Sequence, residues 1–494
     1  MTETFLELKD IYKSFGGVQA LKGVDLTIRS GEIHCLAGEN GSGKSTLIKV
    51  ISGAHDPSQG EIYIEGSKVS RFSPIQAIEH GIQVIYQDFA IFPNLTVAEN
   101  IAMNRAVSTG AKIMDWNCAK KLALEAMEQI GARMDPDILV ENLSVANRQM
   151  VAICRTIIND AKLLILDEPT AALTSKEVQK LYTILRCLRD KKIAVMIVDH
   201  KLGEVFEIAD RLTILRNGEK ISTGLIQEYD RKRFVKDLTG RDISESTYIP
   251  STYDDEVFRV ENLSRKGAFE NISFTIKKGD VLGITGLLDS GRGQIGDALF
   301  GIHPAQSGEI FLHGKPIKIR STTDAVKNRI AYVPEDRLTQ GLFLDRSIQD
   351  NTIAASIKKY FIRGRLDERI MFKETQEWIK KIGCVAPSPD PAIRTLSGGN
   401  AQKIAIAKWL NTKPALLILN GPTVGVDIGA KYDIHRMLHQ LAEQGIGIIV
   451  ISDDLPELIQ NCNSIIIMKN GRIAGTVESS TINETELAEM LSSQ

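Results

Sequence analysis

The sequence predicts an α/β fold that occurs twice along one chain of 494 residues. The first observation is an internal repeat. GENGSGKST at 38–46 corresponds to GLLDSGRGQ at 286–294, an offset of 286 − 38 = 248. LSVAN at 143–147 corresponds to LSGGN at 396–400, an offset of 396 − 143 = 253, in the same order along the chain. The second observation is that a short apolar run precedes each glycine loop and a helix-like segment follows it. Further strand and helix units come after, an alternation typical of α/β domains with a largely parallel sheet.

The repeat also predicts the domain boundaries. The first domain takes residues 1–238 and the second takes 257–494. Between them, 239–256 reads TGRDISESTYIPSTYDDE, and its proline, serines and mixed charge predict a linker.

Bulk composition narrows the classes of function. With 60 Lys and Arg against 62 Asp and Glu, the chain has no excess basic charge, which argues against a nucleic-acid partner. The start, MTETFLELKD, has no basic segment followed by an apolar run, so we expect no secretory signal and a cytoplasmic protein. No apolar stretch approaches the ~18 residues of a membrane span, so a membrane role would need a partner. The six cysteines show no CxxC spacing and are expected to be reduced core thiols.

The first glycine loop predicts a nucleotide-phosphate site. Residues 38–45 fit G-x-x-x-x-G-K-[ST] at every specified position, after the apolar run 33–37 and before a helix-like segment. Such a loop closes backbone N–H groups around phosphate oxygens at the positive end of the helix. We therefore expect ATP, with Lys44 at the β- and γ-phosphates and Ser45 on Mg²⁺. A chance glycine turn is the alternative. The expected nucleotide-binding residues here are Gly38, Glu39, Asn40, Gly41, Ser42, Gly43, Lys44, Ser45 and Thr46.

Two carboxylates follow a later apolar strand. LLILDEPT places Asp167 and Glu168 at the end of the run 163–166. A carboxylate there is costly unless it meets a cation or a hydrated ion, and Glu168 is placed to act as general base on an attacking water. A structural ion pair at the strand end is the alternative. The second copy reads LLILNGPT, so Asn420 and Gly421 stand at the same positions without charge.

These motifs, in this order, resemble an ATP-binding cassette ATPase. Two cassettes in one chain, with PEDRLTQGL at 334–342 and GVDIGAK at 425–431, are similar to the double-cassette ATPases of bacterial monosaccharide importers. The resemblance implies two P-loop NTPase nucleotide-binding domains. Each would have a largely parallel core sheet with helices, an antiparallel β-subdomain and a helical subdomain that carries the LSGGN-type signature. The first domain would have consensus Walker motifs, and the second would have degenerate ones with an intact signature.

The resemblance also implies roles for residues that a pattern alone would leave open. Gln87 would sense the γ-phosphate and ligate Mg²⁺ together with Ser45 and Asp167. His200 would hold the γ-phosphate and the attacking water, although a histidine alone is more often a core or surface residue. Phe15 would stack on adenine, with core packing as the alternative.

In this family two cassettes meet head to tail, so each nucleotide lies between one glycine loop and the opposite signature. Site one would join the first-half motifs to Ser397, Gly398 and Gly399. Site two would be degenerate, because every element of it is altered. The altered positions are Val145, Ala146, Arg292, Gly293, Glu335, Asn420, Gly421 and Asp453.

The resemblance therefore implies the energy-coupling ATPase of a monosaccharide importer. It would lie peripherally at the cytoplasmic face of a bacterial membrane, with integral-membrane permease subunits and a periplasmic or lipid-anchored substrate-binding protein as partners. The segment 88–101 would line the groove for a permease helix, with core packing as the alternative. Import of nucleosides or of a furanone-like signal stays open. A soluble double cassette acting on ribosomes is disfavoured by the short linker and the net charge of −2.

Overall fold

The computed structural model describes residues 3–69, 73–86, 89–108, 115–158, 160–170, 173–199, 201–242, 253–287, 289–362 and 364–492. Its contacts divide the chain into two compact units, Met1–Ser244 and Glu245–Gln494. Part of the expected linker, 243–252, lies outside the described residues, and the predicted boundaries stay predictions.

The first unit contains a six-stranded, mostly parallel sheet and a four-stranded antiparallel sheet. The parallel sheet has the order β10 (Glu219–Leu225), β9 (Arg211–Arg216), β3 (Ile33–Gly38), β8 (Ala194–Asp199), β7 (Leu163–Asp167) and β6 (Ile82–Ile85). Only the edge strand β10 runs antiparallel to its neighbour. The antiparallel sheet has the order β2 (Val18–Arg29), β1 (Thr4–Phe15), β4 (Gln59–Ile64) and β5 (Ser67–Val69).

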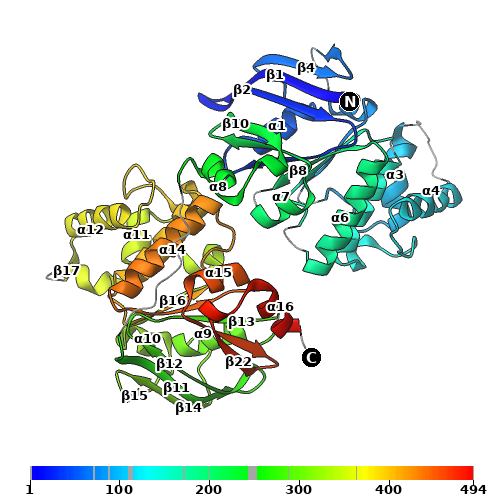
Figure 1. Ribbon diagram of the computed structural model, residues 1–494. Helices are drawn as coiled ribbons and strands as arrows, with labels where there is room; N and C mark the ends of the chain where they lie inside the picture. The colour runs from blue at the N-terminus through cyan, green and yellow to red at the C-terminus, as the bar shows by residue number, and fades with distance from the viewer. Residues whose placement is uncertain are drawn as a thin grey trace. The chain divides into compact units, whose positions relative to one another are not determined.

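Helices cover both faces of that parallel sheet, and the buried strands are apolar on both faces for this reason. In β7, Leu163 and Ile165 pack with α1 and the antiparallel sheet, whereas Leu164 and Leu166 pack with the other helices. Figure 1 shows β1, β2 and β4 gathered at one end of the unit and α3, α4 and α6 at the other. The helices are α1 (Lys44–Ile51), α2 (Pro74–Glu79), α3 (Val97–Ser108), α4 (Trp116–Gln129), α5 (Val145–Ile157), α6 (Ser175–Asp190), α7 (Leu202–Ile208) and α8 (Arg231–Thr239), with 3₁₀ turns η1 (Val140–Asn142) and η2 (Ile226–Glu228).

The second unit repeats both sheets in the same order. Its parallel sheet runs β22 (Arg472–Glu478), β21 (Ser464–Lys469), β13 (Val281–Gly286), β20 (Gly447–Ile451), β19 (Leu416–Asn420) and β16 (Ile330–Val333). Its antiparallel sheet runs β12 (Phe269–Lys277), β11 (Glu256–Arg265), β14 (Ser307–Leu312) and β15 (Lys315–Ile317). A two-stranded hairpin, β17 (Phe361–Ile362) and β18 (Arg365–Leu366), is an addition among the described residues.

The helices of the second unit also follow the order of the first, with eight among the described residues of each. They are α9 (Arg292–Phe300), α10 (Thr322–Lys327), α11 (Ile348–Ile353), α12 (Glu368–Lys381), α13 (Gly398–Leu410), α14 (Ile428–Glu443), α15 (Leu455–Asn461) and α16 (Glu484–Ser492). The short helical turns are η3 (Arg337–Gly341), η4 (Ala354–Tyr360), η5 (Ile393–Thr395) and η6 (Ser479–Thr481). The predicted α/β class, with a parallel core sheet and an antiparallel subdomain in each half, is confirmed.

Four of the six cysteines are buried as expected, and all six are free thiols. Cys118 is exposed and Cys187 is half-buried, so the prediction of core thiols is wrong for these two. Burial raises the pKa of Cys154 to about 12 and that of Cys384 to about 11, which keeps both thiols protonated and inert at neutral pH.

Candidate functional site

The glycine loop of the first unit lies between β3 and α1, where the chain must turn tightly. Gly43 is the residue before the helix and has φ 103°, a backbone conformation that L side chains rarely adopt. A Cβ on Gly38 would collide with the Ser42 hydroxyl and with the Leu215 carbonyl oxygen. The loop therefore needs its glycines in order to close, and its N–H groups lie before the positive end of α1.

Lys44, the first residue of α1, folds back over this loop. Its Nζ donates to the carbonyl oxygens of Gly38 (2.6 Å) and Glu39 (3.0 Å), and only 7% of the residue is exposed. Burial lowers the pKa of Lys44, while the nearby charges of Glu168 and Asp167 oppose that shift. The loop thus holds a buried cation where a phosphate is expected, with the Ser45 side chain exposed beside it.

Two carboxylates lie at the carboxyl end of β7. Burial first, and then repulsion from Glu168, raise the pKa of Asp167, whereas Lys44 lowers it. Glu168 has φ 47°, in the left-handed region, and its N–H donates to the carbonyl oxygen of Val198 at 3.0 Å. Two adjacent, partly buried carboxylates repel each other, and a divalent cation at this place relieves that repulsion. The residues present therefore fit Mg²⁺ with a nucleotide.

Gln87 and His200 lie outside the described residues, so their predicted roles stay predictions. The described chain reaches Tyr86 just after β6 and Asp199 at the end of β8. Because β3, β6, β7 and β8 run parallel, their carboxyl ends meet at one edge of the sheet.

Phe15 ends β1 at the tip of the β1–β2 hairpin, paired across it with Val18. The residue is 45% exposed, so the alternative of core packing is wrong. Its ring meets His55 edge to face, with ring centroids 5.3 Å apart, and the Lys13 ammonium lies 5.2 Å from the ring centroid. Stacking on adenine stays a prediction, now with an accessible ring.

The signature residues of the second unit open helix α13. Ser397 is its N-cap and accepts a hydrogen bond from the Asn400 N–H at 3.4 Å. A Cβ on Gly399 would collide with the Ala430 side chain, and one on Gly398 would come within 3.0 Å of the Gly425 carbonyl oxygen. These glycines are thus required by their own unit, before any nucleotide is considered.

The second glycine loop keeps the backbone of the first but not its chemistry. Gly291 has φ 90° and precedes α9, as Gly43 precedes α1. Arg292 donates to the Gly286 carbonyl oxygen (2.8 Å), and its other nitrogen forms an ion pair with Asp453 (3.2 Å). Gly293 brings no hydroxyl. A cavity of about 690 Å³ lies over this loop, lined among others by Arg292, Gly293, Glu335 and Asn420.

A further difference lies in the hairpin that carries Phe15. In the first unit Leu6 pairs with Ile28, a span of 28 − 6 = 22, whereas in the second Phe258 pairs with Ile276, a span of 276 − 258 = 18. The second hairpin is therefore four residues shorter, and it lacks the tip that holds Phe15. Sequence reasoning missed this loss. The signal was available, because the repeat offset falls from 252 to 248 across the hairpin.

Comparison with known proteins decides the family. The family model described as ABC transporter matches residues 21–171 and 269–424. The chain belongs to the ABC transporter family. The ribose import ATP-binding protein of Caldanaerobacter subterraneus subsp. tengcongensis is 39% identical over 98% of this chain and 98% of its own length. That of Bacillus subtilis is 37% identical over 96% of each chain. A putative ribose/galactose/methyl galactoside import ATP-binding protein of Rhizobium meliloti is 37% identical over 99% and 96%.

A solved ATP-binding cassette of an ABC transporter, in its ADP conformation, is 25% identical with a TM-score of 0.45 and covers 49% of this chain and 100% of its own. The family model and the full-length relatives confirm the resemblance read from the motifs, and the two units are the two cassettes of an ABC transporter ATPase. We call Met1–Ser244 the first cassette and Glu245–Gln494 the second. None of the helices in the described part of the chain has the length and hydropathy needed to cross a membrane.

Proposed function

We propose that this chain is the ATP-hydrolysing, energy-coupling subunit of a monosaccharide importer, with one competent and one degenerate composite ATP site. The relatives named for ribose or galactose import support the cargo class. The observation that carries the asymmetry is the backbone at Glu168 in the first cassette and at Gly421 in the second.

Glu168 follows the buried strand β7, and Gly421 follows the corresponding strand β19 of the second cassette. Both have a left-handed backbone conformation, with φ 47° at Glu168 and 58° at Gly421. The N–H of Glu168 donates to the carbonyl oxygen of Val198 (3.0 Å), and that of Gly421 donates to the carbonyl oxygen of Ile451 (2.8 Å). Glycine adopts this conformation freely, whereas for a residue with a side chain the conformation costs about 1–2 kcal/mol of stability. Strain of this kind persists where function requires it. The first cassette keeps a carboxylate at a position that favours glycine, which supports Glu168 as the general base.

The residues of site one divide the work of hydrolysis. The glycine loop and Lys44 bind the phosphates, Ser45, Gln87 and Asp167 hold Mg²⁺, and Phe15 stacks on adenine. Bound Mg²⁺ supplies charge neutralisation across the phosphate oxygens. Glu168 accepts a proton from the attacking water, and His200 orients that water against the γ-phosphate.

The second cassette completes site one through its signature. Ser397, Gly398 and Gly399 begin α13, a helix of 13 residues whose N-terminal N–H groups carry partial positive charge. We assign these groups to the γ-phosphate of site one. At the corresponding place the first cassette has Val145 and Ala146, whose side chains obstruct a close backbone approach, so site two lacks this partner as well.

Each cassette presents an exposed phenylalanine that a buried asparagine fixes in place. Phe92 is 46% exposed, and the Asn100 side chain binds both its N–H (2.8 Å) and its carbonyl oxygen (2.9 Å). Phe343 is 62% exposed and is held by Asn351 at the same two distances. A rigidly held exposed aromatic is typical of a docking surface. Phe89, at the start of the same segment, is half-buried and packs against the core.

These surfaces support the proposed partners. Two integral-membrane permease subunits would each receive one cassette, one of them at the segment 88–101. A periplasmic or lipid-anchored substrate-binding protein would deliver the sugar to them. The chain would then lie peripherally at the cytoplasmic face of a bacterial membrane, and no nucleic acid takes part.

The deciding experiment removes the proposed base. Glu168→Gln in the transporter, reconstituted with its permease and binding protein, should bind ATP normally and lower turnover by ~10²-fold or more. Sugar uptake should stop with it. ATPase activity that survives the substitution would show that site one is misassigned.

A control addresses site two in the same background. Asn420→Asp and Gly421→Glu together, added to Glu168→Gln, should restore no more than a few per cent of wild-type ATPase activity. A Cβ on Gly421 would lie 2.9 Å from Val424 and 3.0 Å from Glu335, and Gly293 still offers the metal no oxygen. Larger recovery would show that site two is only two residues from competence.

A further inference from the structure

A buried arginine in the second cassette joins three segments that are distant in the sequence. Arg337 begins the turn η3 just after β16 and is 9% exposed. Its guanidinium donates to two successive carbonyl oxygens after β19, those of Val424 (2.5 Å) and Gly425 (2.9 Å). The same guanidinium lies against Gly398, where an added Cβ would come within 2.9 Å of Arg337 Nη2.

The geometry of this contact suits arginine in particular. The planar fork donates from two separate nitrogens, Nη1 to Val424 and Nη2 to Gly425, whereas a lysine would have to reach both carbonyl oxygens from a single nitrogen. Gly425, at φ 65°, turns its carbonyl oxygen to within 3.0 Å of an added Cβ on Gly398. The first turn of α13 is thus wedged between the arginine and the loop that follows β19.

The sequence of the first cassette has no arginine that corresponds to Arg337. By the repeat offset, Val145 stands at the position of Gly398 (398 − 253), whereas Arg337 lies where the offset changes from 248 (335 − 87) to 251 (343 − 92); the first-cassette stretch IYQDFAIFP at 85–93 contains no arginine. Phe89 packs against the core, and Arg155 of α5 donates to its carbonyl oxygen at 3.2 Å. The arginine therefore occurs in the cassette with the intact signature glycine and is absent from the corresponding stretch of the cassette with the altered signature.

We propose that Arg337 is a positioning residue for ATP hydrolysis, which fixes the first turn of the second signature helix against the loop after β19. The inference rests on the proposed function, in which Ser397, Gly398 and Gly399 complete site one. The chain that continues from Arg337 leads within a few residues to Phe343. The same clamp therefore links the proposed permease-facing segment to the signature that faces ATP.

The test separates ATP binding from turnover. Arg337→Lys and Arg337→Gln in the reconstituted transporter should each lower kcat by about tenfold or more. ATP binding to the full chain without permease should stay within about twofold, because Lys44 and its loop are untouched. Arg329→Lys is the matched control and should keep kcat, since Arg329 is an exposed arginine that also donates to one carbonyl oxygen, that of Lys413 (2.8 Å).

The outcomes are distinguishable from failure of the proposed function. If Arg337→Lys and Arg337→Gln both keep wild-type kcat while Glu168→Gln is inactive, Arg337 has no positioning role and the proposed function stands. If Glu168→Gln is active, the proposed function fails whatever Arg337 does. Wild-type kcat in Arg337→Lys would also show that a point charge suffices, and that the fork is not what holds α13.

A double-mutant cycle tests the contact itself without relying on one variant. Gly398→Ala presses a methyl group on the guanidinium, so in an Arg337→Ser background its effect on kcat should shrink by about threefold or more. Gly399→Ala is the matched control, because its added methyl meets Ala430 instead and should show no coupling to position 337. Additive effects for Gly398→Ala would overturn the clamp.

Discussion

The two cassettes share a backbone plan, yet they use the polar positions beside the sheet edge differently. In the first, Glu204 keeps 22% of its side chain exposed and pairs with Lys201 at 2.9 Å. Tyr182 donates to its other oxygen at 3.4 Å. In the second, Glu457 stands at the position of Glu204 (204 + 253) and is only 1% exposed. His435 replaces Tyr182 there.

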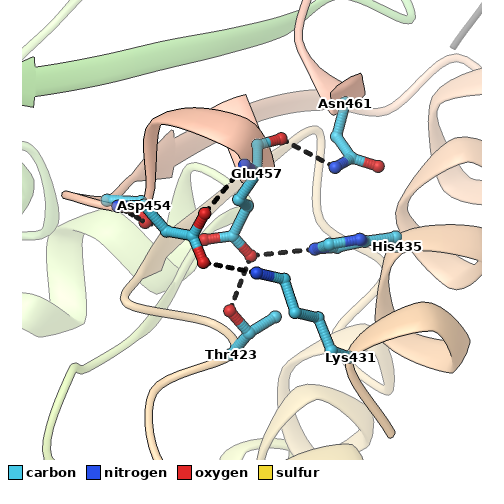
Figure 2. Close-up of polar contacts among 7 residues, drawn as sticks. Thr423, Lys431, His435, Asp454, Glu457 and Asn461 are labelled. Carbon is cyan, nitrogen blue, oxygen red and sulfur yellow. Dashed lines mark hydrogen bonds and ion pairs between the residues drawn. The ribbon is translucent and has the colours of Figure 1, made fainter. Parts of the chain in front are cut away.

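Figure 2 shows how the second cassette surrounds this carboxylate. Glu457 accepts hydrogen bonds from Thr423 (2.8 Å), from Nε2 of His435 (2.9 Å) and from Ser452 (2.7 Å). Asp454, the N-cap of α15, pairs with Lys431 of α14 beside it. The glutamate that is partly exposed in the first cassette is thus turned inward in the second.

The second cassette has no carboxylate at the positions of Asp167 and Glu168, yet this region still makes specific polar contacts. Gly293, Asn420 and Gly421 offer no hydroxyl and no carboxylate, but the same region holds a buried carboxylate that accepts three hydrogen bonds. Such networks are costly when partly satisfied and rigid when complete. We interpret this network as a rigid element within the second cassette.

The largest expected effect concerns the proposed docking surface that each cassette has beside its exposed phenylalanine. A cysteine at Asn94, two residues after Phe92, should crosslink to the permease, and so should one at Asp345, two residues after Phe343. Both positions are exposed. We expect clear crosslinked bands on gels of the reconstituted complex, in a chain whose exposed Cys118 is replaced by serine.

Lys68→Cys, on the exposed edge strand β5, is the control and should give no crosslink. Crosslinks from Asp345 alone would mean that the cassettes differ in docking as well as in chemistry. No crosslink from Asn94, with transport intact, would favour the alternative in which 88–101 serves packing.

A smaller effect is expected from the two glutamates. Glu457→Gln should lower the free energy of unfolding by about 2 kcal/mol, because it weakens several buried hydrogen bonds to a charged group. Glu204→Gln should cost less than about 1 kcal/mol, since its ion pair is partly solvated. Urea unfolding of the full chain, followed by tryptophan fluorescence, measures the cost of Glu457→Gln, because Trp378 and Trp409 both lie in the second cassette. Equal costs would remove this difference between the cassettes.

The same glutamate makes the second cassette sensitive to acid. Burial alone would raise the pKa of Glu457, but the hydrogen bond and charge of His435, then Lys431 and Ser452, hold that pKa below its usual value. A carboxyl whose pKa is lowered by folding stabilises the folded state above its unfolded pKa of about 4.3. That stability is lost as the pH falls from there through the folded pKa. The difference between wild type and Glu457→Gln should therefore shrink below pH ~4.

The sequence was sufficient to predict features that depend on residues close together in the chain. Four apolar residues followed by Asp167 or Asn420 predict a buried strand, and the spacing from Gly38 to Lys44 predicts the glycine loop between a strand and a helix. It was insufficient for Arg337, whose partners lie 87 and 88 residues away. Burial of Glu457 by His435 likewise needs α14 and α15 to be packed first. The exposure of Phe15 could not be predicted from the sequence, because it depends on how the hairpin of β1 and β2 folds.

The smallest effect concerns the backbone strain that distinguishes the two sites. Gly421→Ala should lower stability by about 1–2 kcal/mol, because alanine loses energy at φ 58° and its Cβ would meet Val424 at 2.9 Å. Glu168→Gly should leave stability unchanged or raise it by up to about 1 kcal/mol while abolishing turnover, because glycine relieves the strain at φ 47° but brings no base. Calorimetry of the full chain measures both changes, with ATPase assays beside it. If Glu168→Gly instead destabilises the protein by more than about 1 kcal/mol, the glutamate contributes to the fold, and its retention would no longer distinguish a working site from a degenerate one.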